Sequence, residues 1–419
     1  MKNRISENIT NPEELEKLYH EDKMSFASDF ELIYPSIQDT EMARFWKARL
    51  SFDKLGEKTN DFHLMDIIVL IIACIITGFL IKLPDLFNQI FNETFFYQKY
   101  AGIIIMFGLS VYAIWTNRIF ERKKLNIILV AFLIPVVYMS LLPSDSKSNS
   151  IILAYIHLPF LMWCIYGFIF IRFNTDDKSK RIDYIKYNGD LAILGAVILI
   201  SGAILAGITI GMFSAINVPI KMFYMKYVAV WGLVSAPIVA TYIIRNYPAL
   251  TNKIAPIIAS IFSPLVLITL IFFLVNIPIS GKDLFNDREF LMIFNAMLLG
   301  VMGIIVFSIS ETSIHKKQRF SEMILFALTA VALIIDLFAL SAIFYRLIEF
   351  GITPNRIAVA GSNMLIFGNV ALIMVDLYKV NFKKAGIESV ESTISNYLPV
   401  YAIWTMIVVF GFPFLFGMK

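Results

Sequence analysis

Six polar side chains recur at intervals of seven residues along two long apolar stretches. The first stretch carries Glu322, Thr329 and Asp336, and the second carries Ser362, Asn369 and Asp376. A spacing of two helical turns places each set on one face of a helix. Because a carboxylate inside a hydrocarbon layer is costly, we expect both sets to face protein or water rather than lipid. Ion or proton binding is the chemistry that this pattern predicts.

Asp336 is the strongest single candidate, because it lies near the middle of its apolar stretch. If the two stretches fold into an antiparallel hairpin, the first residue of one set lies beside the last residue of the other. Glu322 would then lie beside Asp376. This register places Asp336 beside Ser362 and Thr329 beside Asn369. Two interpretations stay open: a carboxylate that exchanges a proton or an ion, and a structural side chain hydrogen-bonded to Ser362, Asn363 or a partner from another span.

The turn between the stretches holds a second candidate group, Arg346, Glu349 and Arg356, around Gly351 and Pro354. Arginine binds carboxylate and phosphate groups in a bidentate manner, so two arginines in one short turn suggest an anion site at the outer face. The alternative is that they anchor the helices at the membrane surface and form a local Arg–Glu pair.

The composition predicts a membrane protein. Of the 419 residues, 58% are hydrophobic and 16% are charged, whereas about a quarter of a soluble globular protein is charged. We therefore expect an all-α polytopic membrane helix bundle at 63–419, preceded by a cytoplasmic helical segment at 1–62. Eleven apolar runs are long enough to cross a bilayer, at 63–83, 100–118, 125–142, 151–172, 191–213, 227–245, 255–276, 291–309, 321–347, 357–378 and 397–416.

The loop charges predict the orientation of these spans. When each of the 36 Lys and Arg residues is assigned to the nearer side, 26 fall on the side of the N-terminus and 10 on the other. Positive residues gather on the cytoplasmic side, so we expect the N-terminus inside and the C-terminus outside. The net charge of +4 is then explained without nucleic-acid binding. Membrane lipids are the expected surroundings.

The segment at 1–62 is predicted to form two helices separated by a break at Tyr34-Pro35-Ser36. Asn11 and Pro12 are typical of a helix start, and the second helix is expected from Asp39 to about Asp53. Each has an apolar stripe, so the pair would lie on the inner leaflet or cap the bundle. The alternative is that the segment docks a protein partner.

Other features give little chemistry. The sequence has no phosphate-binding loop and no zinc-type spacing, so we predict no cofactor and no metal site. Cys74 and Cys164 lie in apolar runs and are expected to be packed thiols. His157 is a candidate proton-relay residue or, alternatively, a satisfied core histidine. Gly207 and Gly211, four residues apart, favour close packing against another helix.

The residues Tyr345-Arg346-x-x-Glu349-Phe350-Gly351-Ile352-Thr353-Pro354-Asn355-Arg356 close a long apolar helix. This pattern resembles the Tyr-Gly-hydrophobic-Thr-Pro-Asn-Arg signature of an uncharacterised bacterial family, the domain-of-unknown-function family four-one-five-three. Phe45-Trp46-x-x-Arg49-Leu50 is similar to its Bacteroidetes-like members. The resemblance implies a multi-pass protein of a bacterial inner membrane and brings no established reaction.

Three functions are compatible with these residues. The first, which we favour, is a transporter or permease with a polar pathway along the ninth and tenth spans. The second is a non-catalytic subunit of an envelope complex, docked through 1–62 or through the turn at 345–356. The third is an enzyme that acts on a lipid-linked substrate at the outer face, with Glu349 as base. The chain carries no evident catalytic set, so an enzyme is the less favoured class.

Overall fold

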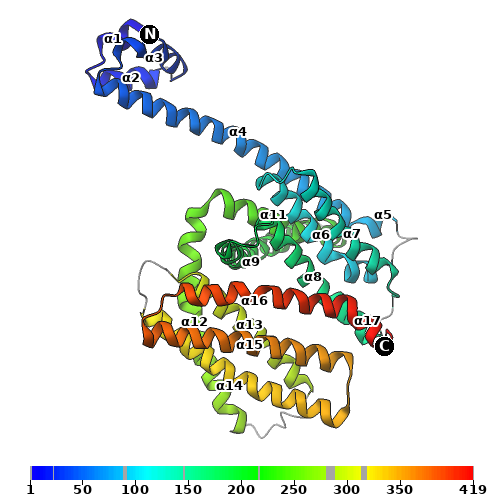
Figure 1. The fold of residues 1–419 in the computed structure, drawn as a ribbon. Helices are drawn as coiled ribbons and strands as arrows, with labels where there is room; N and C mark the ends of the chain where they lie inside the picture. The colour runs from blue at the N-terminus through cyan, green and yellow to red at the C-terminus, as the bar shows by residue number, and fades with distance from the viewer. Residues whose placement is uncertain are drawn as a thin grey trace. The chain divides into compact units, whose positions relative to one another are not determined.

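The computed structural model describes residues 2–21, 23–87, 92–144, 147–215, 218–279, 288–312 and 319–418. Helices are the only regular secondary structure in these ranges (Figure 1). The chain divides into two units, Met1–Val69 and Leu70–Lys419. The first unit contains α1 (Lys2–Glu7), α2 (Pro12–Glu21), α3 (Lys23–Ile37) and the beginning of α4 (Glu41–Ile81). The second contains α5 (Leu83–Leu86), α6 (Glu93–Thr116), α7 (Arg122–Leu141), α8 (Asn149–Phe170), α9 (Lys178–Ala215), α10 (Lys221–Phe223), η1 (Tyr224–Ala229), α11 (Val230–Asn246), α12 (Pro248–Ile279), α13 (Arg288–Ser310), α14 (Arg319–Phe350), α15 (Pro354–Lys383), α16 (Glu388–Met406), η2 (Ile407–Gly411) and α17 (Phe412–Leu415).

The N-terminal unit has a hydrophobic core of its own. Leu15 and Leu18 from α2, Phe26 from α3 and Trp46 from α4 are each almost completely buried in one cluster. The predicted apolar stripes therefore pack against one another within this unit. Phe45 of the second stripe stays 57% exposed, and the placement of this segment on the inner leaflet or against the bundle stays a prediction.

Two predicted helix ends in this unit are wrong. Helix α3 continues through Pro35 to Ile37, where a break was expected. Helix α4 does not end near Asp53 but runs from Glu41 to Ile81, so one helix holds both the second amphipathic stretch and the first apolar run. Helix propensity is a weak guide to where a helix ends, and the surrounding structure often overrides it.

Ten helices among the described residues are long and apolar enough to cross a membrane, and they coincide with ten of the eleven predicted runs. The remaining run, 291–309, falls on α13, whose described apolar part is the shorter stretch Asn295–Ser310. These helices indicate a multi-pass membrane protein. The count of eleven and the inside position of the N-terminus stay predictions.

Helices α14 and α15 form the predicted hairpin (Figure 1). Gly351 has a φ of +75°, a conformation that favours glycine, and it reverses the chain after α14. The Thr353 hydroxyl accepts a hydrogen bond from the backbone N–H of Arg356 at 3.4 Å and caps α15, with Pro354 at its first position. These residues explain the turn by capping rules alone.

The register of the hairpin differs from the predicted one. The Nδ2 atom of Asn381 donates to the backbone carbonyl of Glu322 at 3.3 Å, and the rings of Phe326 and Phe382 meet edge to face. Glu322 therefore lies more than one helical turn away from its expected neighbour, Asp376. The predicted pairing of Asp336 with Ser362 and of Thr329 with Asn369 is wrong for the same reason.

Helix α16 packs along α15 and also contacts α9 and α13. Its contact with α9 includes Ser395, in the first half of α16. Apolar residues of α9, α12, α13, α14, α15 and α16 form one buried cluster. The later part of α9 behaves differently: a Cβ atom added at Gly207 or Gly211 would meet nothing within 4 Å. The expected close packing at these glycines is therefore not made by the described residues of this chain.

Candidate functional site

Asp336 lies in the middle of α14 and is only 2% exposed. Neither of its carboxyl oxygens has a hydrogen-bond partner among the described residues. Buried polar atoms in folded proteins are nearly always paired, and an unpaired one costs free energy. The hydrogen bond of the structural alternative, to Ser362, Asn363 or a residue of another span, is therefore not made by any residue that the structure describes.

Two further polar groups share this part of the core. Asn369 on α15 is 1% exposed, and its Nδ2 atom donates to the hydroxyl of Tyr401 on α16 at 3.1 Å. Its Oδ1 atom has no partner in the part of the chain that the structure describes. The Tyr401 hydroxyl also interacts electrostatically with Asp336. We call Asp336, Asn369 and Tyr401 the central polar cluster.

Ser362 and Asn363 make contacts elsewhere. The indole Nε1 of Trp404 donates to Ser362 Oγ at 3.0 Å, and Asn363 Nδ2 donates to Asn295 Oδ1 at 2.8 Å. A Cβ atom at Gly361 would overlap the Trp404 ring, so this glycine lets α16 approach α15 closely. These bonds fix α13, α15 and α16 around the central polar cluster.

The other members of the predicted set are satisfied separately. Thr329 is fully buried, but its hydroxyl donates to the carbonyl of Leu325 in its own helix at 2.7 Å. Asp376 is paired with Lys379 at 2.7 Å and also accepts a hydrogen bond from Thr393. The sequence paired Asp336 with Ser362 and Asn369 with Thr329, whereas the structure links Asp336 and Asn369 through Tyr401. Thr329 and Asp376 have ordinary structural contacts.

His157 does not join the cluster. Its Nδ1 atom lies 2.9 Å from the carbonyl oxygen of Leu153, one turn earlier in α8, and its ring meets that of Phe160. The structure thus favours the alternative raised by the sequence, a satisfied core histidine.

The turn arginines are used differently from the predicted anion site. The guanidinium of Arg356 donates to the backbone carbonyls of Phe350 and Gly351, the latter at 2.6 Å, and both Arg346 and Arg356 stack on the Phe350 ring. No ion pair joins Glu349 to Arg356 in the described structure, so the expected Arg–Glu pair is not made there. Arg356 thus satisfies carbonyls at the end of α14, where a cation is favourable.

A group of ion pairs at the end of α4 was not among the sites predicted from the sequence. Lys82 is 5% exposed and pairs with Asp85 at 2.9 Å, and Lys226 binds the same carboxylate. Burial alone would raise the pKa of Asp85, but the hydrogen bonds from Lys226 and Lys82 outweigh it and hold that pKa below its usual value. With one acid between two lysines, this group ties α4, α5 and η1 together.

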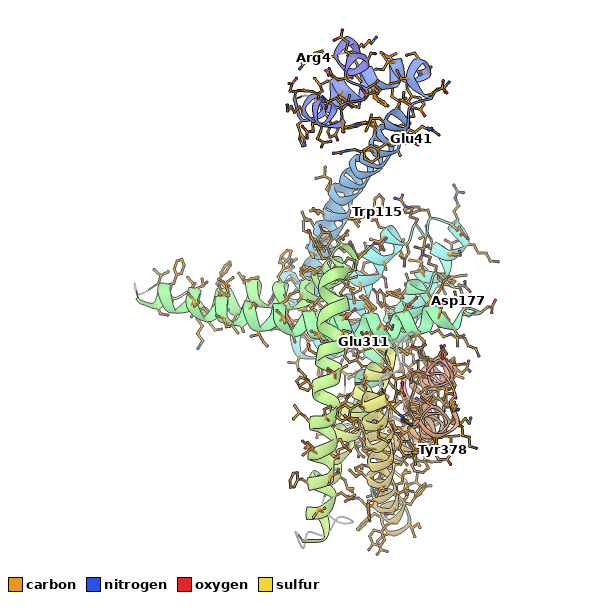
Figure 2. All side chains as sticks on the ribbon, turned by 90° about the vertical axis from the view of Figure 1, so that its left-hand side faces the viewer. Arg4, Glu41, Trp115, Asp177, Glu311 and Tyr378 are labelled. Atoms are coloured by element: carbon orange, nitrogen blue, oxygen red, sulfur yellow. The ribbon has the colours of Figure 1, made fainter. Side chains whose placement is uncertain are left out.

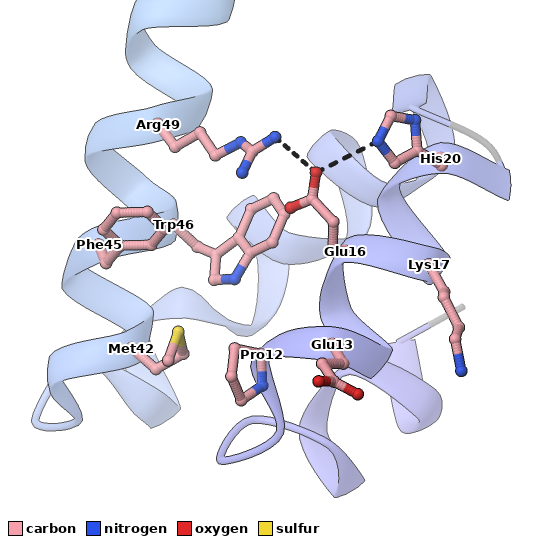
Figure 3. Close-up of a pocket in the computed structure, with 9 residues that line it drawn as sticks. All are labelled: Pro12, Glu13, Glu16, Lys17, His20, Met42, Phe45, Trp46 and Arg49. Carbon is pink, nitrogen blue, oxygen red and sulfur yellow. Dashed lines mark hydrogen bonds and ion pairs between the residues drawn. The ribbon is translucent and has the colours of Figure 1, made fainter.

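The N-terminal unit carries an open pocket of about 750 Å³ between α2 and α4. Met42, Phe45 and Trp46 form its apolar side (Figure 3). Glu16 closes the other side, where it binds Arg49 at 2.7 Å and His20 at 3.2 Å.

Metal chemistry has no visible support in the described ranges, where no three His, Cys, Asp or Glu side chains are grouped to hold an ion. No family model, no curated protein and no solved structure matches the chain. The resemblance of residues 345–356 to an uncharacterised family therefore stays a prediction, and the function has to be argued from the central polar cluster.

Proposed function

We propose that this protein is a membrane transporter in which Asp336 binds and releases a coupling proton or cation. The observation that carries the proposal is a nearly fully buried carboxyl group with both oxygens unpaired among the described residues. An ionisable residue inside a membrane helix is expensive and marks an ion or proton path in most proteins that keep one.

Asn369 and Tyr401 supply the rest of the site. The free Oδ1 of Asn369 is an acceptor for a cation or a protonated group, and the Tyr401 hydroxyl donates or accepts. The cluster thus offers the carboxyl oxygens of Asp336, the Oδ1 atom of Asn369 and the Tyr401 hydroxyl as ligands. No Lys or Arg forms an ion pair with Asp336 among the described residues. Loading and release at Asp336 would change the charge in the core, and that change would favour a different packing of α14, α15 and α16.

The test uses everted membrane vesicles that contain the protein. A proton gradient is imposed across the vesicle membrane, and a pH-sensitive dye measures it. Sugars, amino acids, organic acids and cations are added in turn. We expect one class to dissipate the gradient with the wild-type protein and not with Asp336→Asn. Asp376→Asn is the control, since this carboxylate lies on the same hairpin but is paired with Lys379. Equal dissipation by wild type and Asp336→Asn, or none with wild type for any class, would refute the proposal.

A second candidate function, a docked subunit of a larger assembly, is favoured by one observation in the N-terminal unit. Phe45 is 57% exposed at the rim of the pocket, although the unit has a complete core beneath it. Aromatic residues, Phe among them, are enriched in protein–protein interfaces relative to the rest of the surface. Phe45→Ser should then abolish stoichiometric co-purification of a partner, whereas Leu32→Ser, at another exposed apolar position of the unit, should not.

The third hypothesis, an enzyme at the outer face, has lost support. It needs arginines that hold phosphate, and the guanidinium of Arg356 is already bonded to the backbone of the turn.

A further inference from the structure

A second group of ionisable side chains lies where α9, α13 and α16 meet. Lys186 and Asp190 belong to α9, Glu311 follows the last residue of α13, and Glu391 is in the first turn of α16. Figure 2 labels Glu311 at the level of α9. We call these four residues the edge cluster.

Close packing of the three helices brings these residues together. A Cβ atom at Gly189 would overlap the ring of Phe307, so α9 and α13 touch at this glycine. Asp190 follows Gly189, and Glu311 lies one helical turn after Phe307. Contacts between α9 and α16 complete the junction: Arg181 donates to the carbonyl of Ser395 at 3.1 Å, and the Ser395 hydroxyl donates to that of Lys178 at 3.3 Å.

The charges of the edge cluster do not balance. Among the described residues, Lys186 and Asp190 act electrostatically on Glu311, and Lys186, Asp183 and Glu388 act on Glu391. Lys186 is the one cation common to both sets, and it has no carboxylate oxygen within the 4.0 Å of an ion pair in the described structure. Among the described residues, Asp190, Glu311 and Glu391 therefore share Lys186 as their one cation.

Glu391 is the member that points to a ligand. It is 9% exposed, and its Oε1 atom has no hydrogen-bond partner in the described ranges. An unpaired oxygen at this depth calls for a proton or a bound cation to offset its cost. No three His, Cys, Asp or Glu side chains among the described residues are grouped to hold a metal ion, whereas a proton needs only one carboxyl oxygen.

We propose that Asp190, Glu311 and Glu391 form a proton-binding site around Lys186, which takes up one proton near neutral pH. Burial raises the pKa of Glu311 to about 7, since the opposing effect of Lys186 is smaller and Asp190 adds to the rise. Glu311 lies just beyond the apolar part of α13, Asn295–Ser310, and its side chain is partly exposed.

The site also has a place in the transport mechanism, and this part rests on the function proposed above. Glu391 and Tyr401 both belong to α16, ten residues and therefore about 15 Å apart along the helix. That distance is too long for a direct proton transfer, so the edge cluster would act as a loading site separate from Asp336. The two sites share one helix, and protonation of either one would alter its packing.

The test is infrared spectroscopy of the purified full-length protein in detergent, comparing pH 6 with pH 8. Ordinary carboxyl groups are ionised at both values, so the difference spectrum shows the C=O band of any carboxyl that titrates between them. The measurement is made in the Asp336→Asn background, so that failure of this proposal and failure of the transport proposal are distinguishable. We expect one carboxyl band, lost in Glu311→Gln.

Two further variants separate a proton site from a structural role. Lys186→Met removes the shared positive charge and should raise the midpoint of the titration by about half to one pH unit, while Lys186→Arg should leave it close to wild type. Glu388→Gln, at the outside of the cluster, should retain the band. A band that persists in Glu311→Gln, or a midpoint that Lys186→Met does not move, would overturn the proposal. Loss of the band on addition of millimolar Ca²⁺ would also overturn it and indicate a cation site.

Discussion

Replacing Asp336 by leucine should make the protein more stable while it destroys the proposed function. Leucine keeps the branch at Cγ, but its two methyl groups are larger than the two oxygens, so tighter packing offsets part of the gain. The matched control below carries the same increase in volume. Both oxygens of Asp336 are buried and unpaired among the described residues. Removing an unsatisfied buried polar group recovers its desolvation cost, about 1–3 kcal/mol. Insertion scales for a carboxylate at a helix centre give a similar value, about 2.5–3.5 kcal/mol.

Asn363→Leu is the matched control. Asn363 has nearly the same burial as Asp336, but its Nδ2 atom donates to Asn295 at 2.8 Å. The same change of shape there leaves the Asn295 amide unpaired, so we expect a loss of about 1–3 kcal/mol. The two substitutions should therefore change the free energy of unfolding in opposite directions.

The assay is reversible unfolding in mixed micelles that contain an increasing fraction of SDS. The loss of helix is measured by circular dichroism. Asp336→Leu should need more SDS for half unfolding than wild type, and Asn363→Leu less. A loss of stability in Asp336→Leu comparable to that in Asn363→Leu would refute the reasoning. It would mean that the carboxyl group has a structural partner and that its burial needs no functional explanation.

Four other changes test separate features. Gly361→Ala forces the Trp404 ring away from α15 and should cost about 1–3 kcal/mol, as overpacking does, with a shift of tryptophan fluorescence as readout. Glu311 has a folded pKa of about 7 against 4.5 when unfolded, so its contribution to stability is complete below pH 4.5 and is lost as the pH rises through 7. Glu311→Gln should remove this part of the pH dependence, about 2 kcal/mol after allowance for partial exposure, as seen in melting temperatures from pH 4.5 to 8. Arg356→Gln weakens the bonds to the carbonyls at the end of α14 and should cost about 1 kcal/mol in the SDS assay. Trp46→Ala opens the core of the N-terminal unit, costs about 3–5 kcal/mol and should unfold that unit first, detected as rapid proteolysis within residues 1–69.

Length and hydrophobic pattern were enough to predict the helices. Ten of the eleven expected runs coincide with long apolar helices, because a stretch of about 20 apolar residues has few alternatives to a membrane helix. The hairpin turn was also predictable in part: Gly351, Thr353 and Pro354 act through local backbone rules that do not depend on distant residues.

The register of the hairpin could not be predicted from the polar spacing. Seven-residue intervals place Asp336 and Asn369 on helix faces, but they do not say how far one helix slides along the other. In the observed register the Phe326 ring packs against Phe382, Ser362 bonds with Trp404, and Asp336 interacts with Tyr401 instead.

The sequence alone therefore determined which segments are helical and apolar and which carboxylate is deepest in them. Only the tertiary structure decided the partners of each polar group: Tyr401 with Asn369, Trp404 with Ser362, and three acids around Lys186. The physical reason is that helix formation and capping are local, whereas a buried polar group is satisfied or left unpaired by residues far away in the chain. The central polar cluster and the edge cluster both depend on such long-range contacts.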